Sequence, residues 1–310
     1  MTPVWLWVAF GAIVVFLLAL DLGVFNRKAH EVKLKEALGW TAVWILTALI
    51  FNVGIYVWKG HQPAAEFLTA YVIEKALSVD NIFVFIIIFS YFHVGKKYQH
   101  KILFWGVIGA VLMRAVFIGA GVAVIDRFAW VMYVFGAFLV FTGIKLAVKK
   151  DEKIDPENNI GVRLLKKVMP VTHSADHGHF FTRINGKLHA TTLFVALVVV
   201  EMTDLIFAVD SIPAVLAVSR DPFIAYTSNI FAIMGLRSLY FALAGVMDLF
   251  HYLRFGLAVI LVFVGVKMLI AEHYHFPVMV SLGVILGVLT ASVAASLIWP
   301  VKKTHTDHAH

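Results

Sequence analysis

The stretch EMTDLIFAVDSIP (residues 201–213) lies inside an apolar run that covers residues 193–218. It carries three carboxylates, those of Glu201, Asp204 and Asp210. The run is long enough to cross the hydrocarbon core of a bilayer, which takes about 20 residues of helix. A charged side chain at the centre of a bilayer costs about 2.5–3.5 kcal/mol on insertion scales. The stretch therefore predicts a transmembrane helix whose acids face a protein interior, a water path or a cation.

The whole chain has the composition of a polytopic membrane protein. Of its 310 residues, 61% are hydrophobic and only 15% are charged, and the mean hydropathy is +0.87. Such values exclude an ordinary soluble domain. Nine segments are apolar and long enough to span a bilayer: residues 4–24, 38–58, 66–92, 101–123, 128–148, 191–218, 223–246, 254–271 and 276–299. We therefore predict an all-α polytopic membrane protein with nine transmembrane helices, the first of them a retained span and not a cleaved leader.

The formal net charge of +7 is explained by membrane topology. Most lysines and arginines fall in the loops that follow the odd-numbered spans, and such loops stay in the cytoplasm under the positive-inside rule. This places the N-terminus outside and the C-terminus inside, and it calls for no nucleic-acid partner. The chain has no cysteine, which excludes disulfides, thiolate metal sites and cysteine nucleophiles.

Two parts of the chain resemble each other at a nearly constant offset. Three pairs of segments align: SVDNIFVF (78–85) with MTDLIFAV (202–209), VLMRAVF (111–117) with MGLRSLY (234–240), and GIKL (143–146) with GVKM (265–268). The alignment pairs Asp80 with Asp204 and Arg114 with Arg237. Because each copy contains three spans, the second copy is inverted relative to the first. The sequence therefore predicts an inverted 3+3 helix repeat, a plan that secondary transporters use around a midplane site.

The repeat divides the chain into six parts. They are two leading spans (1–62), the first repeat (63–148), a cytoplasmic connector (149–190), the second repeat (191–272), a trailing span (273–300) and a histidine-containing tail (301–310). The connector and the tail contain closely spaced histidines in HSADHGH (173–179) and HTDHAH (305–310). These are interpreted as solvated side chains, with metal gathering as the alternative.

The acids within the spans are candidates for a metal site. Five lie at depth, namely Glu74, Asp80, Glu201, Asp204 and Asp210, and three bases could balance them, namely Lys75, Arg114 and Arg237. Buried salt bridges alone would leave a surplus of negative charge and stabilise poorly, whereas a divalent cation would balance it. Possible further ligands are Ser78, Asn81 and Ser211. An all-oxygen ligand set suits Mn²⁺, Mg²⁺ or Ca²⁺ and does not discriminate among them.

Helix geometry restricts which of these acids can share one ion. Glu201 and Asp204 lie on one face, but Asp210 falls about 180° from Glu201 and about 13.5 Å further along a straight helix. Pro213 could act as a hinge, because it removes a backbone donor and a local unwinding would re-aim Asp210 and Ser211. A simple packing kink is an equally good interpretation of this proline.

Three segments carry a family resemblance: EKALSVDNIFVF (74–85), EMTDLIFAVDSIPA (201–214) and DPFIAYTSNIFAIMGLRSLYF (221–241). They resemble the TerC family, in particular its Alx-type branch, and the similarity covers essentially the whole chain. The resemblance implies a bacterial inner-membrane protein of a lysine-exporter-like transporter group, whose Alx-type members are associated with manganese export and alkaline pH. It also implies that the five acids form the metal pathway.

Two functions follow as hypotheses. The first is a secondary transporter that exports Mn²⁺, with protons as the counter-ion and Arg114 and Arg237 pairing with the carboxylates when the metal leaves. The second is a membrane scaffold or assembly factor whose buried acids are structural. An intramembrane enzyme is disfavoured because no G-x-S-x-G or H-E-x-x-H pattern is present. Neither hypothesis requires an organic cofactor, and membrane lipid is the expected surrounding.

Overall fold

The structure is a computed structural model, and it describes residues 3–25, 34–128, 130–148, 160–172, 178–244, 252–271, 274 and 276–299. The side chain of Asp80, the tail and most of the histidine-rich part of the connector lie outside the described residues.

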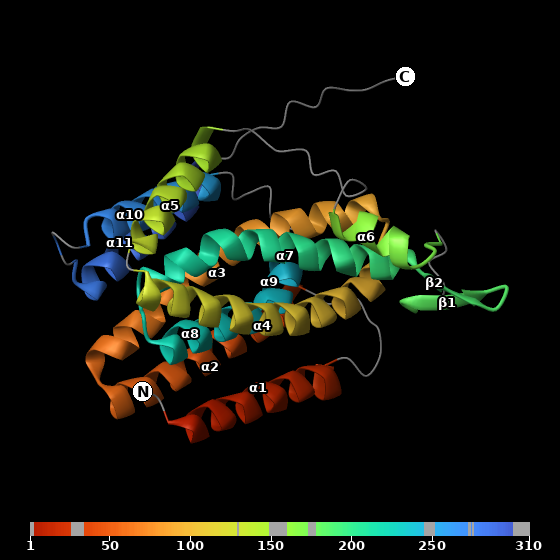
Figure 1. Cartoon of the computed structure of the whole chain (residues 1–310), viewed down its shortest axis with the longest axis horizontal. Helices are drawn as coiled ribbons and strands as arrows, with labels where there is room; N and C mark the ends of the chain where they lie inside the picture. The colour runs from red at the N-terminus through yellow and green to blue at the C-terminus, as the bar shows by residue number, and fades with distance from the viewer. Residues whose placement is uncertain are drawn as a thin grey trace.

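Helices form almost all of the regular structure in the described residues (Figure 1). They are α1 (Val4–Phe25), α2 (Leu34–Lys59), α3 (His61–Tyr91), α4 (Lys96–Arg127), α5 (Val131–Val148), α6 (Ile160–Val168), α7 (Thr192–Leu216), α8 (Pro222–Met234), α9 (Leu236–Leu243), α10 (Leu253–Leu269) and α11 (Val278–Ile298). One antiparallel hairpin, β1 (Phe181–Ile184) and β2 (Lys187–Ala190), belongs to the connector. The prediction of an all-helical membrane domain is thereby confirmed.

Five helices are long and apolar enough to cross a membrane by length and composition: α2, α4, α5, α7 and α11. The other expected spans differ for identifiable reasons. Helix α1 is 22 residues long, but its described apolar stretch ends at Leu20. Helix α3 carries acids and a lysine in its middle, and α10 has only 17 residues. The segment expected over residues 223–246 is divided at Gly235 into α8 and α9. The count of nine spans therefore stays a prediction.

The central helices are layered around α3 and α7. In Figure 1, α4 runs beside α7, while α5, α10 and α11 form a group at one corner and α1 lies along one edge. Helix α4 packs on α7, α8 packs on α3, and α3 and α7 also contact each other. Three clusters of buried apolar side chains pack between these helices. Glu74 of α3 and Asp204 of α7 are thus buried between helices.

Helices α5 and α10 approach each other so closely that their backbones touch. A Cβ atom added to Gly136 would lie 2.9 Å from the carbonyl oxygen of Gly265, and one added to Gly265 would lie 2.6 Å from that of Gly136. A Cβ atom on Gly143 would lie 2.8 Å from the carbonyl oxygen of Ala258. Small residues allow such approach in membrane helices, where close packing replaces hydrophobic attraction between helices.

One end of the bundle is tied together by polar contacts around the start of α8. Asp221 caps this helix by accepting a hydrogen bond from the Phe223 amide at 2.9 Å, the position and residue type that favour helix initiation. The same carboxylate forms an ion pair with Lys59 at the end of α2. Ser219, just before the cap, donates to Glu66 of α3 at 2.6 Å.

The connector contains more regular structure than its composition suggested. Asn185 and Gly186 join β1 to β2 with positive φ angles of 50° and 77°. An Asn-Gly pair between two short strands is a strong hairpin signal because both residues tolerate this backbone region. The signal was therefore available in the sequence at INGK (184–187).

Candidate metal centre

Arg114 is the centre of a buried polar cluster between four helices. Its side chain lies on α4 with no exposed surface. The Nη1 atom forms an ion pair with Glu74 of α3. The same atom donates to Oδ1 of Asn229 at 2.9 Å and to Oγ of Ser211 at 3.1 Å. Side chains from α3, α7 and α8 therefore converge on one nitrogen of an arginine from α4.

Glu74 is held from two sides. One carboxylate oxygen pairs with Arg114, and the other accepts a hydrogen bond from Nδ2 of Asn229 at 3.0 Å. The side chain is completely buried, and these contacts satisfy the hydrogen-bonding demand that burial imposes. Asn229 thus bridges the acid and the base.

Asn229 was not among the residues predicted from the sequence. It ends the polar triplet Thr227-Ser228-Asn229 inside an apolar helix. Thr227 and Ser228 donate to backbone carbonyls of their own helix, as hydroxyls in membrane helices commonly do. An asparagine offers both donors and an acceptor, and this one reaches across to other helices. The polar triplet in an apolar helix was therefore a signal for a site residue, but the threonine and serine beside Asn229 are common in membrane helices and made the asparagine hard to single out.

Asp204 is held much more loosely than Glu74. Its Oδ1 atom lies 3.7 Å from Nη2 of Arg114, and it accepts a long hydrogen bond of 3.5 Å from Asn81. Its Oδ2 atom has no hydrogen-bond partner among the described residues, although only 4% of the residue is exposed. The hydroxyl of Ser78 is likewise buried and without a described partner. The cluster consequently has unused oxygen atoms.

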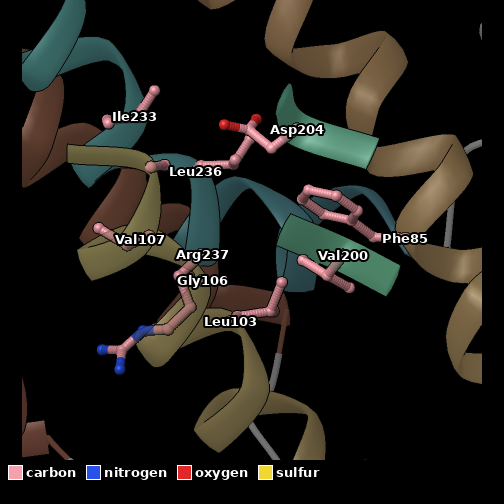
Figure 2. A pocket seen from close by; sticks show the side chains of 10 residues that line it. Phe85, Leu103, Gly106, Val107, Val200, Asp204, Ile233, Leu236 and Arg237 are labelled. Carbon is pink, nitrogen blue, oxygen red and sulfur yellow. The ribbon is translucent and has the colours of Figure 1, made fainter. Parts of the chain in front are cut away.

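A small pocket lies next to Asp204. Its cavity volume is about 10 Å³, which is about the space that one water molecule requires. Figure 2 shows the guanidinium of Arg237 directed away from the Asp204 carboxylate at this pocket. The remaining walls are mainly apolar and come from α3, α4, α7, α8 and α9. The described pocket therefore has room for a small species only.

The break between α8 and α9 lies beside this pocket. Gly235 separates the two helices, and Lys75 donates from Nζ to the carbonyl oxygen of Ala232 at 3.1 Å. A Cβ atom on Gly235 would lie 2.6 Å from this Nζ atom. Lys75 was expected to balance a carboxylate, but it instead supplies a donor to the last turn of α8, where carbonyls lack intrahelical partners. Helix breaks of this kind border the ion sites of many transporters.

Glu201 lies against α4, one helical turn from Asp204. A Cβ atom on Gly109 would be 2.0 Å from Oε1 of Glu201, so the glycine leaves the space that the carboxylate fills. The side chain is half-buried. Within the described part of the chain, no hydrogen bond or ion pair engages it. Glu201 is therefore a carboxylate without a fixed partner at the α4–α7 contact.

Asp210 points to a different neighbour from the other acids. Its Oδ1 atom accepts a hydrogen bond from Thr142 of α5 at 3.2 Å. Helix α7 remains helical through Pro213 to its end at Leu216, so the unwound turn considered for this proline is not present. Ser211 joins the Arg114 cluster, whereas Asp210 stays outside it because the two side chains leave the intact helix in different directions.

The five acids therefore do not form one preformed site. Glu74 and Asp204 meet through Arg114, Glu201 lies one turn away, Asp210 faces α5, and the side chain of Asp80 is outside the described residues. No group of three histidine, aspartate or glutamate side chains close enough to hold a metal occurs among the described residues. In this conformation a guanidinium, together with neutral oxygen and nitrogen groups, occupies the centre of the cluster.

Comparisons with known proteins place the chain among bacterial membrane proteins. Residues 59–304 match the family model described as "Integral membrane protein TerC family". The chain is 53% identical over 294 residues to "Uncharacterized membrane protein STKORF319" of Myxococcus xanthus, covering 94% of this chain and 92% of that protein. It is 46% identical over 301 residues to "Putative membrane-bound redox modulator Alx" of Salmonella typhi, covering 94% and 93%. No solved structure matches the chain.

Proposed function

This chain belongs to the TerC family of integral membrane proteins, and on that premise we propose that it is a secondary transporter that exports Mn²⁺ in exchange for protons. The observation that carries the proposal is the buried cluster around Arg114. One guanidinium faces two carboxylates, Glu74 and Asp204, and one oxygen of Asp204 is left without a described partner. Ionisable groups inside a membrane domain are costly and mark ion pathways by default.

The ligand chemistry supports a hard divalent cation. The side chains around the cluster offer carboxylate, amide and hydroxyl oxygens, which suit Mn²⁺ and also Mg²⁺ or Ca²⁺. In the proposed pathway, Glu74 and Asp204 form the core and Glu201 lies next to it. Asp210 would join the pathway in a conformation other than the one described, and Asp80 is assigned to it from the sequence. The proposed location is the bacterial inner membrane, with the N-terminus outside and the C-terminus in the cytoplasm.

The packing of the helices supports the proposed inverted repeat. The offset that aligns Gly143 with Gly265 also aligns Gly136 with Ala258. Under this correspondence, the contact of Gly136 with Gly265 becomes the contact of Ala258 with Gly143, and both are present. The packing of α4 on α7 likewise corresponds to that of α8 on α3. We propose that the two halves rock about this pseudo-symmetric contact to alternate access.

A membrane scaffold is the competing function, and one observation favours it. Both oxygens of Glu74 have partners in Arg114 and Asn229, as they would in a purely structural network.

The name of the Alx relatives describes a redox modulator. Because this chain has no cysteine, thiol chemistry has no residue to act through, whereas export of a redox-active metal would influence redox state indirectly.

Mn²⁺ flux into or out of proteoliposomes tests the proposal. Purified wild-type protein is expected to carry Mn²⁺, with Ca²⁺ and Mg²⁺ as competitors, and Asp204→Asn is expected to abolish the flux while remaining monodisperse. The substitution removes the charge and keeps the shape of the side chain. Asp126→Asn is the matched control, because that acid is exposed at the end of α4. A folded wild-type protein that carries no metal under any gradient favours the scaffold.

A second test uses the space that Gly109 leaves for Glu201. Gly109→Ala is expected to keep the protein folded, because the carboxylate is the far end of a flexible side chain and can move. It is expected to reduce Mn²⁺ flux by up to roughly a hundredfold, because it moves the carboxylate away from its place beside Asp204. Gly119→Ala is the control on the same helix, since no atom lies within 4 Å of its added Cβ. Equal flux in the two variants would remove Glu201 from the pathway.

A further inference from the structure

We propose that Nη1 of Arg114 occupies the position of the transported cation, inside a cage of oxygen atoms from Glu74, Ser211 and Asn229. Arg114 is then a tethered competitor of the metal. This inference rests on the proposed function and deepens it, because it assigns a specific binding site and a mechanism of release. It also gives Asn229, a neutral residue, a direct role as a ligand.

The contacts of Nη1 resemble those of a coordinated cation. Three oxygen atoms from three helices surround this single nitrogen: a carboxylate oxygen of Glu74, Oδ1 of Asn229 at 2.9 Å and Oγ of Ser211 at 3.1 Å. A terminal guanidinium nitrogen carries only two hydrogens, so three acceptors exceed what it can serve with full hydrogen bonds. The cage thus offers more ligands than the arginine nitrogen uses.

The rest of the guanidinium is poorly satisfied. Neither Nε nor Nη2 of Arg114 has a hydrogen-bond partner in the described part of the chain, although the whole residue is buried. An arginine selected for a structural ion pair usually forms two parallel hydrogen bonds with a carboxylate. Here Asp204 stays 3.7 Å from Nη2. Nη1 therefore has several hydrogen-bond acceptors, whereas Nε and Nη2 have no hydrogen bond among the described residues. This is expected for a group that alternates with a cation at the same position.

The charges of the cluster permit a divalent ion in the cage. With Glu74 and Asp204 ionised, the cluster has a net charge of −1 with Arg114 alone and +1 when a divalent cation binds beside a retained Arg114, so neither state departs from neutrality by more than one unit. Oxygen ligands of hard divalent ions lie about 2.0–2.6 Å away. The cage would reach this range by a small contraction around the metal. Ser78, one turn from Glu74 on α3, carries a further buried hydroxyl without a described partner.

The displaced guanidinium has a destination at the second carboxylate of the cluster, that of Asp204, which lies 3.7 Å from Nη2. Oδ2 of Asp204 has no hydrogen-bond partner among the described residues, and Asp204 lines the small pocket, whose wall also includes Ala110, one turn before Arg114 on α4. Arrival of the metal at Glu74 would move Arg114 toward Asp204, and return of Arg114 to Glu74 would expel the metal. The cation site would then never be left with an uncompensated carboxylate, which is the costly state in a membrane interior.

Mn²⁺ affinity measured by titration calorimetry on the full-length protein in detergent tests the exchange. Arg114→Gln is expected to bind Mn²⁺ at least about tenfold more tightly than wild type, because the tethered competitor is gone, and to release it more slowly in flux assays. Damage to the fold would weaken binding, so tightening is not a result that a structural role predicts. Adding Asn229→Ala to Arg114→Gln is expected to reverse the gain.

Ser228→Ala is the matched control for Asn229→Ala, since its hydroxyl donates to the Ala225 carbonyl at 3.1 Å. If Arg114→Gln does not fold, Asn229→Ala alone is expected to weaken Mn²⁺ binding at least fivefold while Ser228→Ala leaves it unchanged. If the wild type carries Mn²⁺ but folded Arg114→Gln binds Mn²⁺ no more tightly than the wild type, the tethered-cation inference alone is overturned. Equal Mn²⁺ binding by Asn229→Ala and the wild type has the same consequence. A wild-type protein that neither binds nor carries Mn²⁺ overturns the proposed function itself.

Discussion

Replacement of Glu74 by alanine is expected to lower the free energy of unfolding by about 3–5 kcal/mol, the usual cost of removing one partner of a buried ion pair. The substitution strands Arg114, which is fully buried and which cannot lose its proton. It also leaves the Nδ2 group of Asn229 without its acceptor. Asp204 would remain 3.7 Å from the guanidinium and would moderate the loss. Reversible denaturation in detergent micelles measures the difference.

Two variants determine whether charge or packing causes this loss. Glu74→Gln keeps an acceptor for Arg114 and should be less destabilising than Glu74→Ala. Arg114→Gln should also be less destabilising, because the carboxylates it leaves behind can take up protons, whereas a guanidinium cannot release one. If Glu74→Ala lowers the free energy of unfolding by less than about 1 kcal/mol, the loss is no larger than that of an exposed ion pair. Such a result would contradict the interpretation of the cluster as a tight buried network.

Gly265→Ala is expected to cause the second large effect, a destabilisation of about 1–3 kcal/mol or more through overpacking. The added Cβ atom would lie 2.6 Å from the carbonyl oxygen of Gly136 and 2.9 Å from the backbone nitrogen of Val140. These obstacles are backbone atoms, so relief requires α5 and α10 to move apart. Separation of the two helices should also impair transport, because the two halves of the protein are proposed to rock about this contact. Thermal unfolding followed by size-exclusion chromatography measures the effect.

Gly283→Ala and Gly287→Ala provide the matched controls for this prediction. Both glycines lie in α11, and no atom is within 4 Å of either added Cβ. Alanine has the higher helix propensity by about 1 kcal/mol, so these variants should be neutral or slightly more stable. If Gly265→Ala behaved like them, α5 and α10 would be able to separate without cost, and the close backbone contact would not be essential to the fold.

The class of protein and the chemistry of its interior could be predicted from the residues alone. Apolar runs of membrane-spanning length allow only helices here, because helices satisfy their backbone groups internally. Buried acids within such runs, for example Glu74 and Asp204, must face protein because lipid cannot solvate them. The inverted repeat was predicted from the residues and the metal pathway from the residues and the family resemblance, and both stay proposals.

Which side chains meet depends on how the separate helices pack against one another. A helical period assigns a residue to a face, but it does not say which neighbouring helix covers that face. The sequence therefore could not show which residues contact Arg114. It also did not indicate Asn229 as a site residue, because this asparagine follows a threonine and a serine whose hydroxyls bond within their own helix. Lys75 donates a hydrogen bond to a carbonyl at the end of α8, and Asp210 accepts one from Thr142. Both contacts join different helices, so they follow from helix packing and could not be predicted from the spacing of residues along one helix.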